Sequence, residues 1–190
     1  MNRSFLWLGA SAVVAIAACA PLHHSAEATP LAAASRCAAD SNYQRLAFWV
    51  GDWDLFDSTG LQYATQRVRP VVDACAFTAE WTGRVGDRGL GLAAFDVKTG
   101  EWKQFYVSNL VAIPSGVWVR KSDPSYTGPG IRLIPLVEPA SGDLSRSRMT
   151  IMPMPYQRAL QLFEDSPDGG KTWRTVFKSD NRPRVTSAPQ

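Results

Sequence analysis

The sequence predicts an all-β protein, folded as an antiparallel up-and-down barrel of about ten strands. From residue 51 onward, turn signals rich in glycine, proline, aspartate and serine recur about every ten residues, and helical periodicity is almost absent. The connections between strands are short, which makes each strand antiparallel to the one before it. A barrel accounts for these observations most simply, and a sandwich is the alternative.

The amino-terminal residues 1–18 are expected to form a secretory signal peptide. Arg3 supplies a short positive region, and an almost wholly apolar stretch of about fifteen residues follows it. That length suits a signal peptide and is short for a transmembrane helix. A buried core helix is the alternative, but the Ala-, Pro- and Ser-rich stretch that comes next argues against it. We therefore expect the chain to be exported.

Cys19 is the expected site of lipid attachment. Ile16-Ala17-Ala18-Cys19 resembles a lipobox, in which small residues precede the cysteine that takes the lipid. Ordinary cleavage after the A-x-A-like Ala26-Glu27-Ala28 is the alternative. Because position 20 is Ala rather than Asp, the signal for retention in the inner membrane is missing. We expect a periplasmic lipoprotein of the outer membrane, in contact with the membrane through its lipid anchor alone.

The rest of the chain divides into three parts by composition. Residues 19–36 hold the anchor cysteine and an Ala- and Pro-rich stretch that cannot bury an apolar face, which predicts a flexible tether. Residues 37–180 are enough for one domain with a good core, the β-barrel. Residues 181–190 are polar and contain proline, which predicts a disordered tail.

Composition also excludes several classes of function. The formal net charge is +3, and the basic residues are scattered rather than clustered, which argues against nucleic acid as a partner. Both histidines, His23 and His24, lie in the tether, so the barrel has no imidazole for a metal, a haem or a catalytic base. No P-loop or dinucleotide fingerprint occurs. We therefore expect no metal site and no cofactor, and we assign no catalytic residue.

Two cysteines remain for the barrel once Cys19 carries the lipid. In an oxidising compartment this even pair, Cys37 and Cys75, is expected to form a disulfide. The alternative is a redox or metal pair, which lacks both a C-x-x-C spacing and a partner histidine. If Cys19 is not lipidated, one thiol is left over.

The expected elements follow one another from residue 41. A helical turn over Ser41–Val50, capped by Asp40 or Ser41, leads into the first strand at Gly51. Ser58-Thr59-Gly60 ends that strand, because serine and glycine favour turns. The expected strands are Asp52–Asp57, Gln62–Val72, Ala74–Thr82, Gly89–Val97, Glu101–Ser108, Gly116–Lys121, Ile131–Val137, Ser147–Met152, Gln157–Glu164 and Thr172–Lys178.

Two details of these strands are also predictable. Lys98-Thr99-Gly100 is typical of a tight hairpin, and in the strand that follows Trp102, Gln104 and Tyr106 share one face. Pro135 and Pro153 suit strand ends, edges or bulges, because proline has no N–H to donate.

One turn near the carboxyl end matches the Asp-box pattern S-x-D-x-G-x-x-W. Its residues are Ser166, Asp168, Gly170 and Trp173. In such a turn the Asp side chain accepts hydrogen bonds from turn amides, the glycines allow positive φ, and the tryptophan packs beneath the hairpin. The pattern occurs once, so we interpret it as a structural turn rather than as evidence of sialidase chemistry.

An ordered series of motifs resembles one family. The series is Phe48-x-x-Gly51-x-Trp53, Ala74-Cys75-x-x-x-x-Glu80-Trp81, Gly89-x-Gly91, Trp102-x-Gln104, and Gln161 with the Asp-box hairpin. Over residues 37–180 the chain is similar to a group of uncharacterised bacterial secreted proteins with a G-x-W near the first strand. The resemblance implies a lipocalin-like (calycin) barrel, with Trp53 plugging one end, and no established activity. The chain departs from the family pattern in two places: Ala74 stands where a glycine is usual, and Phe105-Tyr106 stands where a tryptophan-containing stretch is usual. These differences affect the expected shape of the pocket and not the fold.

Polar residues on otherwise apolar strands are the candidates for a ligand pocket. A polar group inside a barrel costs about 1–3 kcal/mol unless it is paired, so such groups favour convergence on a ligand. Alternation alone does not decide which face is inside. The candidates are Glu80, Trp102, Gln104, Arg120, Arg148 and Gln161.

We expect from these candidates a carrier of a small apolar or amphiphilic ligand. One alternative is an envelope scaffold or interaction protein, whose barrel interior is filled with side chains. The other is a hydrolase or isomerase that uses Glu80 or an Asp as general acid or base.

Overall fold

The computed structural model describes residues 36–109, 117–137 and 139–185. The expected signal peptide, Cys19 and the tether up to residue 35 lie outside the described residues, as do residues 186–190 of the expected tail. No helix in the described part is long and apolar enough to cross a membrane.

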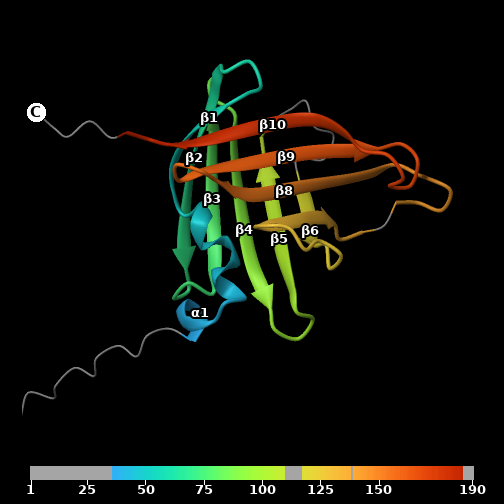
Figure 1. The fold of residues 1–190 in the computed structure, drawn as a ribbon, viewed down its shortest axis with the longest axis horizontal. Coiled ribbons are helices and arrows are strands. Elements are labelled where there is room, and N and C mark those ends of the chain that lie inside the picture. Colours follow the sequence, from blue (N-terminus) through green and yellow to red (C-terminus); the bar gives the residue numbers. More distant parts are fainter. Residues whose placement is uncertain (1–35, 110–116, 138, 186–190) are drawn as a thin grey trace, which may run out of the picture. The chain divides into compact units, whose positions relative to one another are not determined.

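Ten antiparallel strands of the described chain close into a barrel, which confirms the predicted fold class. Strands that follow one another in sequence are paired, and β1 closes the barrel by pairing with β10. This is the up-and-down order of a lipocalin-like fold. In Figure 1, β8, β9 and β10 (orange to red) cross β3, β4 and β5 (green) steeply. The strands are β1 (Gly51–Phe56), β2 (Gln62–Val71), β3 (Ala76–Gly83), β4 (Arg88–Asp96), β5 (Glu101–Ser108), β6 (Val117–Ser122), β7 (Ile131–Pro135), β8 (Arg146–Met154), β9 (Arg158–Ser166) and β10 (Arg174–Pro183).

Side-chain alternation decides which face of each strand is inside. In β5, Trp102 and Gln104 are buried whereas Phe105 and Val107 are exposed. The face that carries Trp102, Gln104 and Tyr106 is therefore the inner one. The predicted hairpin between β4 and β5 also forms, with Gly100 at a φ of 69°, a conformation that glycine adopts without strain.

The last strand is longer than the sequence predicts. Composition places the end of the barrel at residue 180, but β10 continues to Pro183. Asn181, the first residue of the expected tail, is fully buried. Its amide is satisfied inside the barrel by Ser179 and Gln66, so a polar residue near the chain end belongs to the sheet.

Two irregularities in the ladder turn additional side chains toward the interior. The pairing of β2 with β1 skips Tyr63, and the pairing of β10 with β9 skips Val176. A bulge of this kind shifts the alternation of side chains locally. Both side chains border the interior cavity described below.

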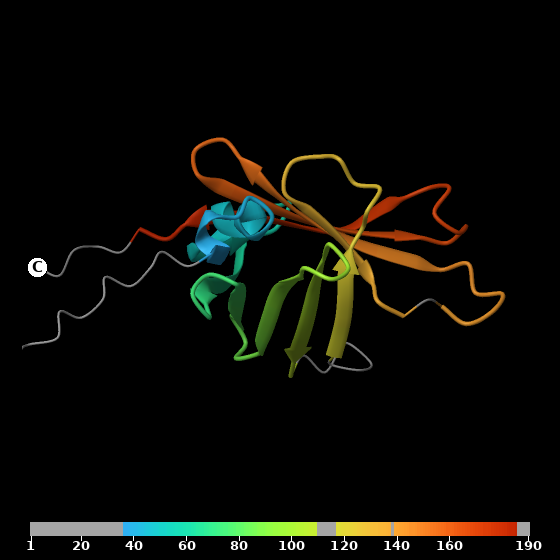
Figure 2. The same ribbon diagram turned by 90° about the horizontal axis from the view of Figure 1, so that it is seen from below.

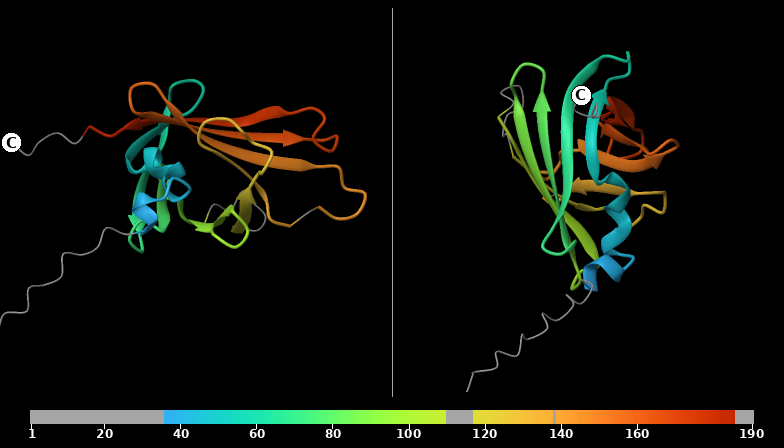
Figure 3. Two further views of the ribbon diagram at one scale, coloured as in Figure 1. Left: turned by 60° about the horizontal axis from the view of Figure 1, so that its bottom comes forward. Right: turned by 90° about the vertical axis from the view of Figure 1, so that its left-hand side faces the viewer.

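A short helical segment closes one end of the barrel. It consists of α1 (Arg36–Ala39) and the 3-10 helix η1 (Tyr43–Trp49). Arg36 therefore begins a helix rather than ending the tether, and η1 starts after Asn42 instead of at the expected cap, Asp40 or Ser41. The Asp40 carboxylate still helps, because it accepts a hydrogen bond from the Asn42 N–H at 2.8 Å. Figures 2 and 3 show this segment (blue) packed against the barrel.

Three contacts fix the helical segment. The predicted disulfide is present and links Cys37 of α1 to Cys75 in the β2–β3 turn. Trp102 Nε1 of β5 donates to the Asn42 carbonyl at 3.2 Å, and Arg45 Nε donates to the Gly130 carbonyl at 3.0 Å. These contacts hold the segment against β5 and the β6–β7 connection.

The packed core lies at this closed end. Trp49, Trp53, Phe77 and Trp102 are each at most 3% exposed. Trp53 Nε1 donates to the Trp49 carbonyl at 2.9 Å, which ties β1 to the end of η1. A Cβ on Gly51 would lie 3.3 Å from Cε2 of Trp53, so glycine leaves room for the indole. Trp53 thus fills the closed end, as the G-x-W motif predicts.

The outer face of β4, β5 and β6 is apolar. Leu92 pairs with Phe105, and Phe105 pairs with Val119 on the next strand. The exposed apolar residues of this face are Leu90, Leu92, Phe105, Val107, Val117 and Val119. Contiguous apolar side chains on a surface often mark an interaction site.

Candidate ligand-binding site

A cavity of about 820 Å³ lies inside the barrel. Trp49 of the helical segment and Leu55 of β1 border it at the closed end. Asp87, which directly precedes β4, Ser108 at the end of β5 and Asp165 near the end of β9 border it on the opposite side of the barrel. The cavity therefore reaches the end that the helical segment does not cover, and its volume lies within the range of ligand pockets, about 300–1,000 Å³.

Aromatic side chains form much of the cavity wall. Tyr106 lies against Trp118 with ring centroids 5.4 Å apart, and Phe163 lies against Phe177 at 5.9 Å. Such tilted pairs supply a large apolar surface with a defined geometry. The aromatic residues that border the cavity are Trp49, Tyr63, Trp81, Tyr106, Trp118, Phe163 and Phe177.

Glycines on β4 make room for Tyr106. A Cβ on Gly89 would overlap the Tyr106 hydroxyl, and a Cβ on Gly91 would lie 3.3 Å from Cδ2 of the same ring. Gly89-x-Gly91 therefore serves close packing between neighbouring strands and lets the Tyr106 ring lie flat across β4.

One wall of the cavity carries a hydrogen-bonded chain of amides and hydroxyls. Gln66 Oε1 accepts from Gln161 Nε2 at 3.0 Å and from Asn181 Nδ2 at 3.3 Å. Asn181 Oδ1 accepts from Ser179 Oγ, which in turn accepts from the Tyr63 hydroxyl, both at 2.7 Å. Burial raises the pKa of Tyr63 to about 12, so its hydroxyl remains a donor at neutral pH. This wall satisfies its polar groups internally.

Arg120 of β6 is arranged differently. Its Nη1 donates to Gln104 Oε1 at 3.2 Å, and its guanidinium carbon lies 5.7 Å from the centre of the Trp118 ring. Among the described residues Arg120 forms no ion pair. Burial lowers the pKa of Arg120 to about 10, while Tyr106 acts in the opposite direction. The guanidinium therefore still carries its positive charge at neutral pH.

Four of the six predicted pocket residues border the cavity, namely Gln104, Arg120, Arg148 and Gln161. The two arginines differ in their partners. The Arg148 guanidinium donates to both Glu164 carboxylate oxygens, at 2.7 and 3.0 Å, and lies 3.8 Å over the Trp173 ring. Its charge is already neutralised by Glu164, whereas Arg120 has no carboxylate partner among the described residues.

The other two predicted pocket residues do not border the cavity. Glu80 is exposed on the outer face of β3, between Ala79 and Trp81, which face inward. The prediction for Glu80 is wrong because alternation shows that one face is buried without showing which. Trp102 does point inward, but it lies in the packed core at the closed end and is 1% exposed.

Several residues of the cavity and of the network behind its wall were not predicted. Tyr63 lines the cavity and faces inward only because β2 bulges there. Asn181, which was assigned to the tail, is buried behind Gln66. Gln66 offered a signal, since it lies between Ala64 and Val68 on the same face of β2. Trp118 and Asp87 gave no pattern that separates them from surface residues.

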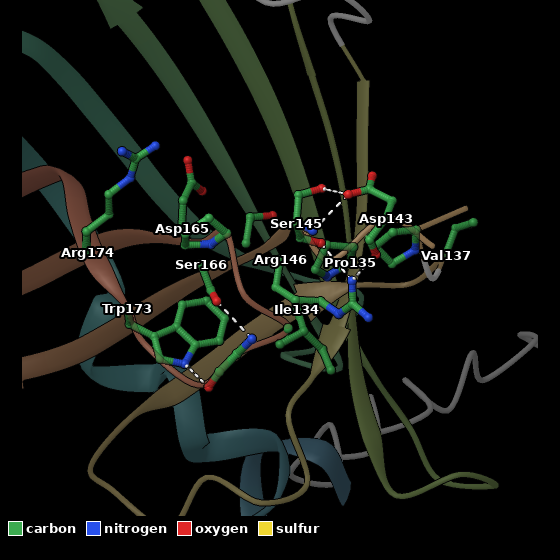
Figure 4. Close-up of a pocket in the computed structure, with 15 residues that line it drawn as sticks. Ile134, Pro135, Val137, Asp143, Ser145, Arg146, Asp165, Ser166, Trp173 and Arg174 are labelled. Atoms are coloured by element: carbon green, nitrogen blue, oxygen red, sulfur yellow. Dashed lines mark hydrogen bonds between the residues drawn. The ribbon is translucent and has the colours of Figure 1, made fainter. Parts of the chain in front are cut away.

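A second hollow, of about 660 Å³, lies outside the barrel beside the Asp-box turn. Figure 4 shows Trp173 under Ser166 on one side and Asp143, Ser145 and Arg146 on the other. The polar groups of this hollow form hydrogen bonds mainly within their own turns. Ser145 Oγ donates to Asp143 Oδ1 at 2.6 Å, and Trp173 Nε1 donates to the Gly170 carbonyl at 3.0 Å.

The Asp-box turn itself is a closed network. Ser166 Oγ donates to Asp168 Oδ1 and accepts from the Gly170 N–H, both at 2.8 Å. Thr172 donates twice to the Asp168 carboxylate, through its hydroxyl at 2.6 Å and its N–H at 2.9 Å. These bonds use the side chains locally, so the interior cavity is the better candidate for a ligand site.

Within residues 36–109, 117–137 and 139–185, no cluster of His, Cys, Asp and Glu side chains could hold a metal ion. No protein-family model matches the chain, and no curated protein matches it. The resemblance to secreted G-x-W proteins therefore stays a prediction, while the barrel that it implies is present.

Proposed function

We propose that this protein is an exported binding protein that holds a small, partly apolar ligand inside its barrel. The observation that carries the proposal is the cavity of about 820 Å³, with an aromatic wall and a few directed polar groups. Ligand pockets have this composition, because apolar surface supplies affinity and sparse polar groups supply orientation. The resemblance to lipocalin-like secreted proteins points in the same direction.

Export and lipid attachment belong to the same proposal. The Cys37–Cys75 disulfide is typical of oxidising compartments, which supports export. Cys19 would then carry the lipid and anchor the barrel at the periplasmic face of the outer membrane. Intact-mass analysis of the exported chain tests this, since a mature chain that begins with a diacylated Cys19 is expected. A mature chain that begins at residue 29 would contradict lipid attachment.

Binding is tested on the full chain with Cys19→Ala, exported by a bacterial host. This variant carries no lipid, so it can be purified without detergent. We expect the neutral fluorophore N-phenyl-1-naphthylamine to bind at one molecule per chain with enhanced emission. We also expect solvent extraction of the untreated protein to release a small molecule, identified by mass spectrometry. If the fluorophore does not bind and the extract is empty, the binding function is wrong.

A matched pair of variants locates the fluorophore. Ala79 of β3 borders the cavity, and Ala94 of β4 lies on the outer face, where it alternates with buried Ala93. Ala79→Phe should weaken binding by about tenfold or more, because the ring occupies cavity volume. Ala94→Phe should leave binding unchanged, with circular dichroism confirming that both variants are folded. Equal effects of the two substitutions would place the fluorophore elsewhere.

An envelope interaction protein is the second candidate, favoured by the exposed apolar face of β4, β5 and β6. The test is cross-linking in intact cells with the wild-type chain and with Phe105→Lys. Loss of a cross-linked product in the variant, with unchanged fluorophore binding, would support an interaction role separate from the cavity.

A further inference from the structure

Arg120 is a cation inside the cavity whose charge the described protein leaves unpaired. One hydrogen bond, to Gln104 Oε1, uses one of the five N–H groups of its guanidinium. The ring of Trp118 covers part of one side. A buried charge is costly unless a partner charge and hydrogen bonds compensate it. The remaining donors of Arg120 are therefore available to an acceptor that enters the cavity.

The neighbouring cations differ from Arg120, because each of them is paired with a carboxylate. Arg148 borders the same cavity, but Glu164 holds it with two hydrogen bonds. Lys121, next to Arg120 in β6, faces the other way and pairs with Glu101. Arg120 thus differs from its neighbours in having an amide and an aromatic ring where they have a carboxylate.

The surroundings of Arg120 define the rest of the ligand. Tyr106 and Trp118 lie next to it on β5 and β6, one step nearer the open end of the barrel. Leu55, Met149 and Phe163 line the cavity on other strands. An apolar body can fill this space while an anionic group reaches the guanidinium.

The charge of the ligand is limited by two aspartates. Asp87 and Asp165 border the cavity toward its open end, and Asp87 Oδ1 is buried without a hydrogen-bond partner among the described residues. Among the described residues that border the cavity, Arg120 is the one cation without a carboxylate partner, so the second negative charge of a dianion such as a phosphomonoester would find no cation to match it. A single carboxylate matches one guanidinium, which can bind it through two parallel hydrogen bonds.

We infer that the cavity takes an amphiphilic monocarboxylate, with its carboxylate on Arg120 and its apolar body against the aromatic wall. This inference rests on the proposed binding function and adds the charge of the ligand to it. Gln104 acts as a positioning residue, because its amide oxygen accepts from Arg120 and fixes the direction of the guanidinium.

The test compares two probes with the same alkyl chain, dodecanoate and dodecanol, on the full chain with Cys19→Ala. Each displaces N-phenyl-1-naphthylamine at pH 7.5 in wild type, Arg120→Met and Arg174→Met. Arg174 lies at the start of β10 outside this cavity, so its variant removes one positive charge without touching the site.

We expect wild type and Arg174→Met to bind dodecanoate about 10- to 100-fold more tightly than dodecanol, as for a charge-assisted hydrogen-bonded pair. In Arg120→Met this preference should disappear through loss of dodecanoate affinity, while dodecanol and the fluorophore bind as before. Retained fluorophore binding also shows that the variant is folded.

Three outcomes would overturn the inference. Wild type could bind both probes equally, Arg120→Met could keep the preference, or Arg174→Met could lose it to the same extent, which would indicate a general field effect. In each case the fluorophore still binds, so the binding function survives. If the fluorophore did not bind to the wild-type chain, the proposed binding function itself would be wrong.

Discussion

At the scale of single residues, Gln66 is the shared acceptor of the cavity network. Its Oε1 accepts from both Gln161 and Asn181. Gln66→Met keeps the length of the side chain but leaves two buried donors unpaired. Each such donor costs about 1–3 kcal/mol, so we expect the free energy of unfolding to fall by about 2–6 kcal/mol. Urea denaturation followed by tryptophan fluorescence measures the change.

Gln62→Met is the matched control for Gln66→Met. Gln62 lies on the same strand, and its Nε2 donates to Asp54 at 3.1 Å in a part-buried setting that water reaches. We expect a loss below about 1 kcal/mol. Equal losses for the two variants would mean that the interior network does not contribute as a unit.

Asp168 predicts an acid-dependent loss of stability. Hydrogen bonds from Thr172, and then from Ser166, lower the pKa of Asp168 from 3.8 to about 2. Because the folded pKa lies below the unfolded one, the stabilisation is present above pH 3.8 and is lost as the pH falls through about 2. The free energy of unfolding should therefore decrease over this window more in wild type than in Asp168→Asn. Urea titrations across the window measure both slopes, and identical slopes would contradict the prediction.

The residue scale is also where prediction from sequence was least complete. Gln104, Arg120 and Gln161 were found because polar side chains stand out on apolar strands. Glu80 stood out equally, but it lies on the other face of β3. The missing information was which face of each strand points into the barrel, because that depends on partners far away in the sequence.

At the scale of elements, β10 closes the barrel by pairing with β1, and the residues at its end form hydrogen bonds with β1 and β2. A chain that stops at residue 180 loses Asn181 and the hydrogen bond from Arg184 Nε to Asp54. We expect its free energy of unfolding to fall by about 3 kcal/mol or more, because an interior network and a strand end are both removed. A chain that stops at residue 185 keeps every contact named here and serves as the control. Thermal unfolding of the two chains measures the difference, and equal midpoints would contradict it.

Strands were predicted better than their ends. All ten expected strands overlap the observed ones, because glycine-containing turns and side-chain alternation are local signals. The bulge at Tyr63 and the extension of β10 depend on neighbouring strands, so no local pattern announces them. The helix α1 is only four residues long and is held by its disulfide, which is also a non-local constraint.

At the scale of the whole molecule, the Cys37–Cys75 disulfide joins the helical segment to the barrel across 38 residues of sequence. In the chain-entropy model a loop of this size stabilises the folded state by up to about 4 kcal/mol. Cys37→Ala with Cys75→Ala should lower the free energy of unfolding by an amount of this order. Reduction of the wild-type chain by dithiothreitol is the control and should give a similar loss. An unchanged urea midpoint in both cases would show that the disulfide is not a source of stability.

The closed end of the barrel has a consequence for how a ligand would enter and leave the cavity. Among the described residues, Trp49, Trp53 and Trp102 fill that end, so a ligand of the proposed kind would enter and leave the cavity at the opposite end. Uptake and release of the ligand would then take place at the same end of the barrel and could not occur at the same time. If the proposed binding function holds, a donor and an acceptor of the ligand would have to contact the same end of the barrel one after the other, because the three tryptophans fill the opposite end.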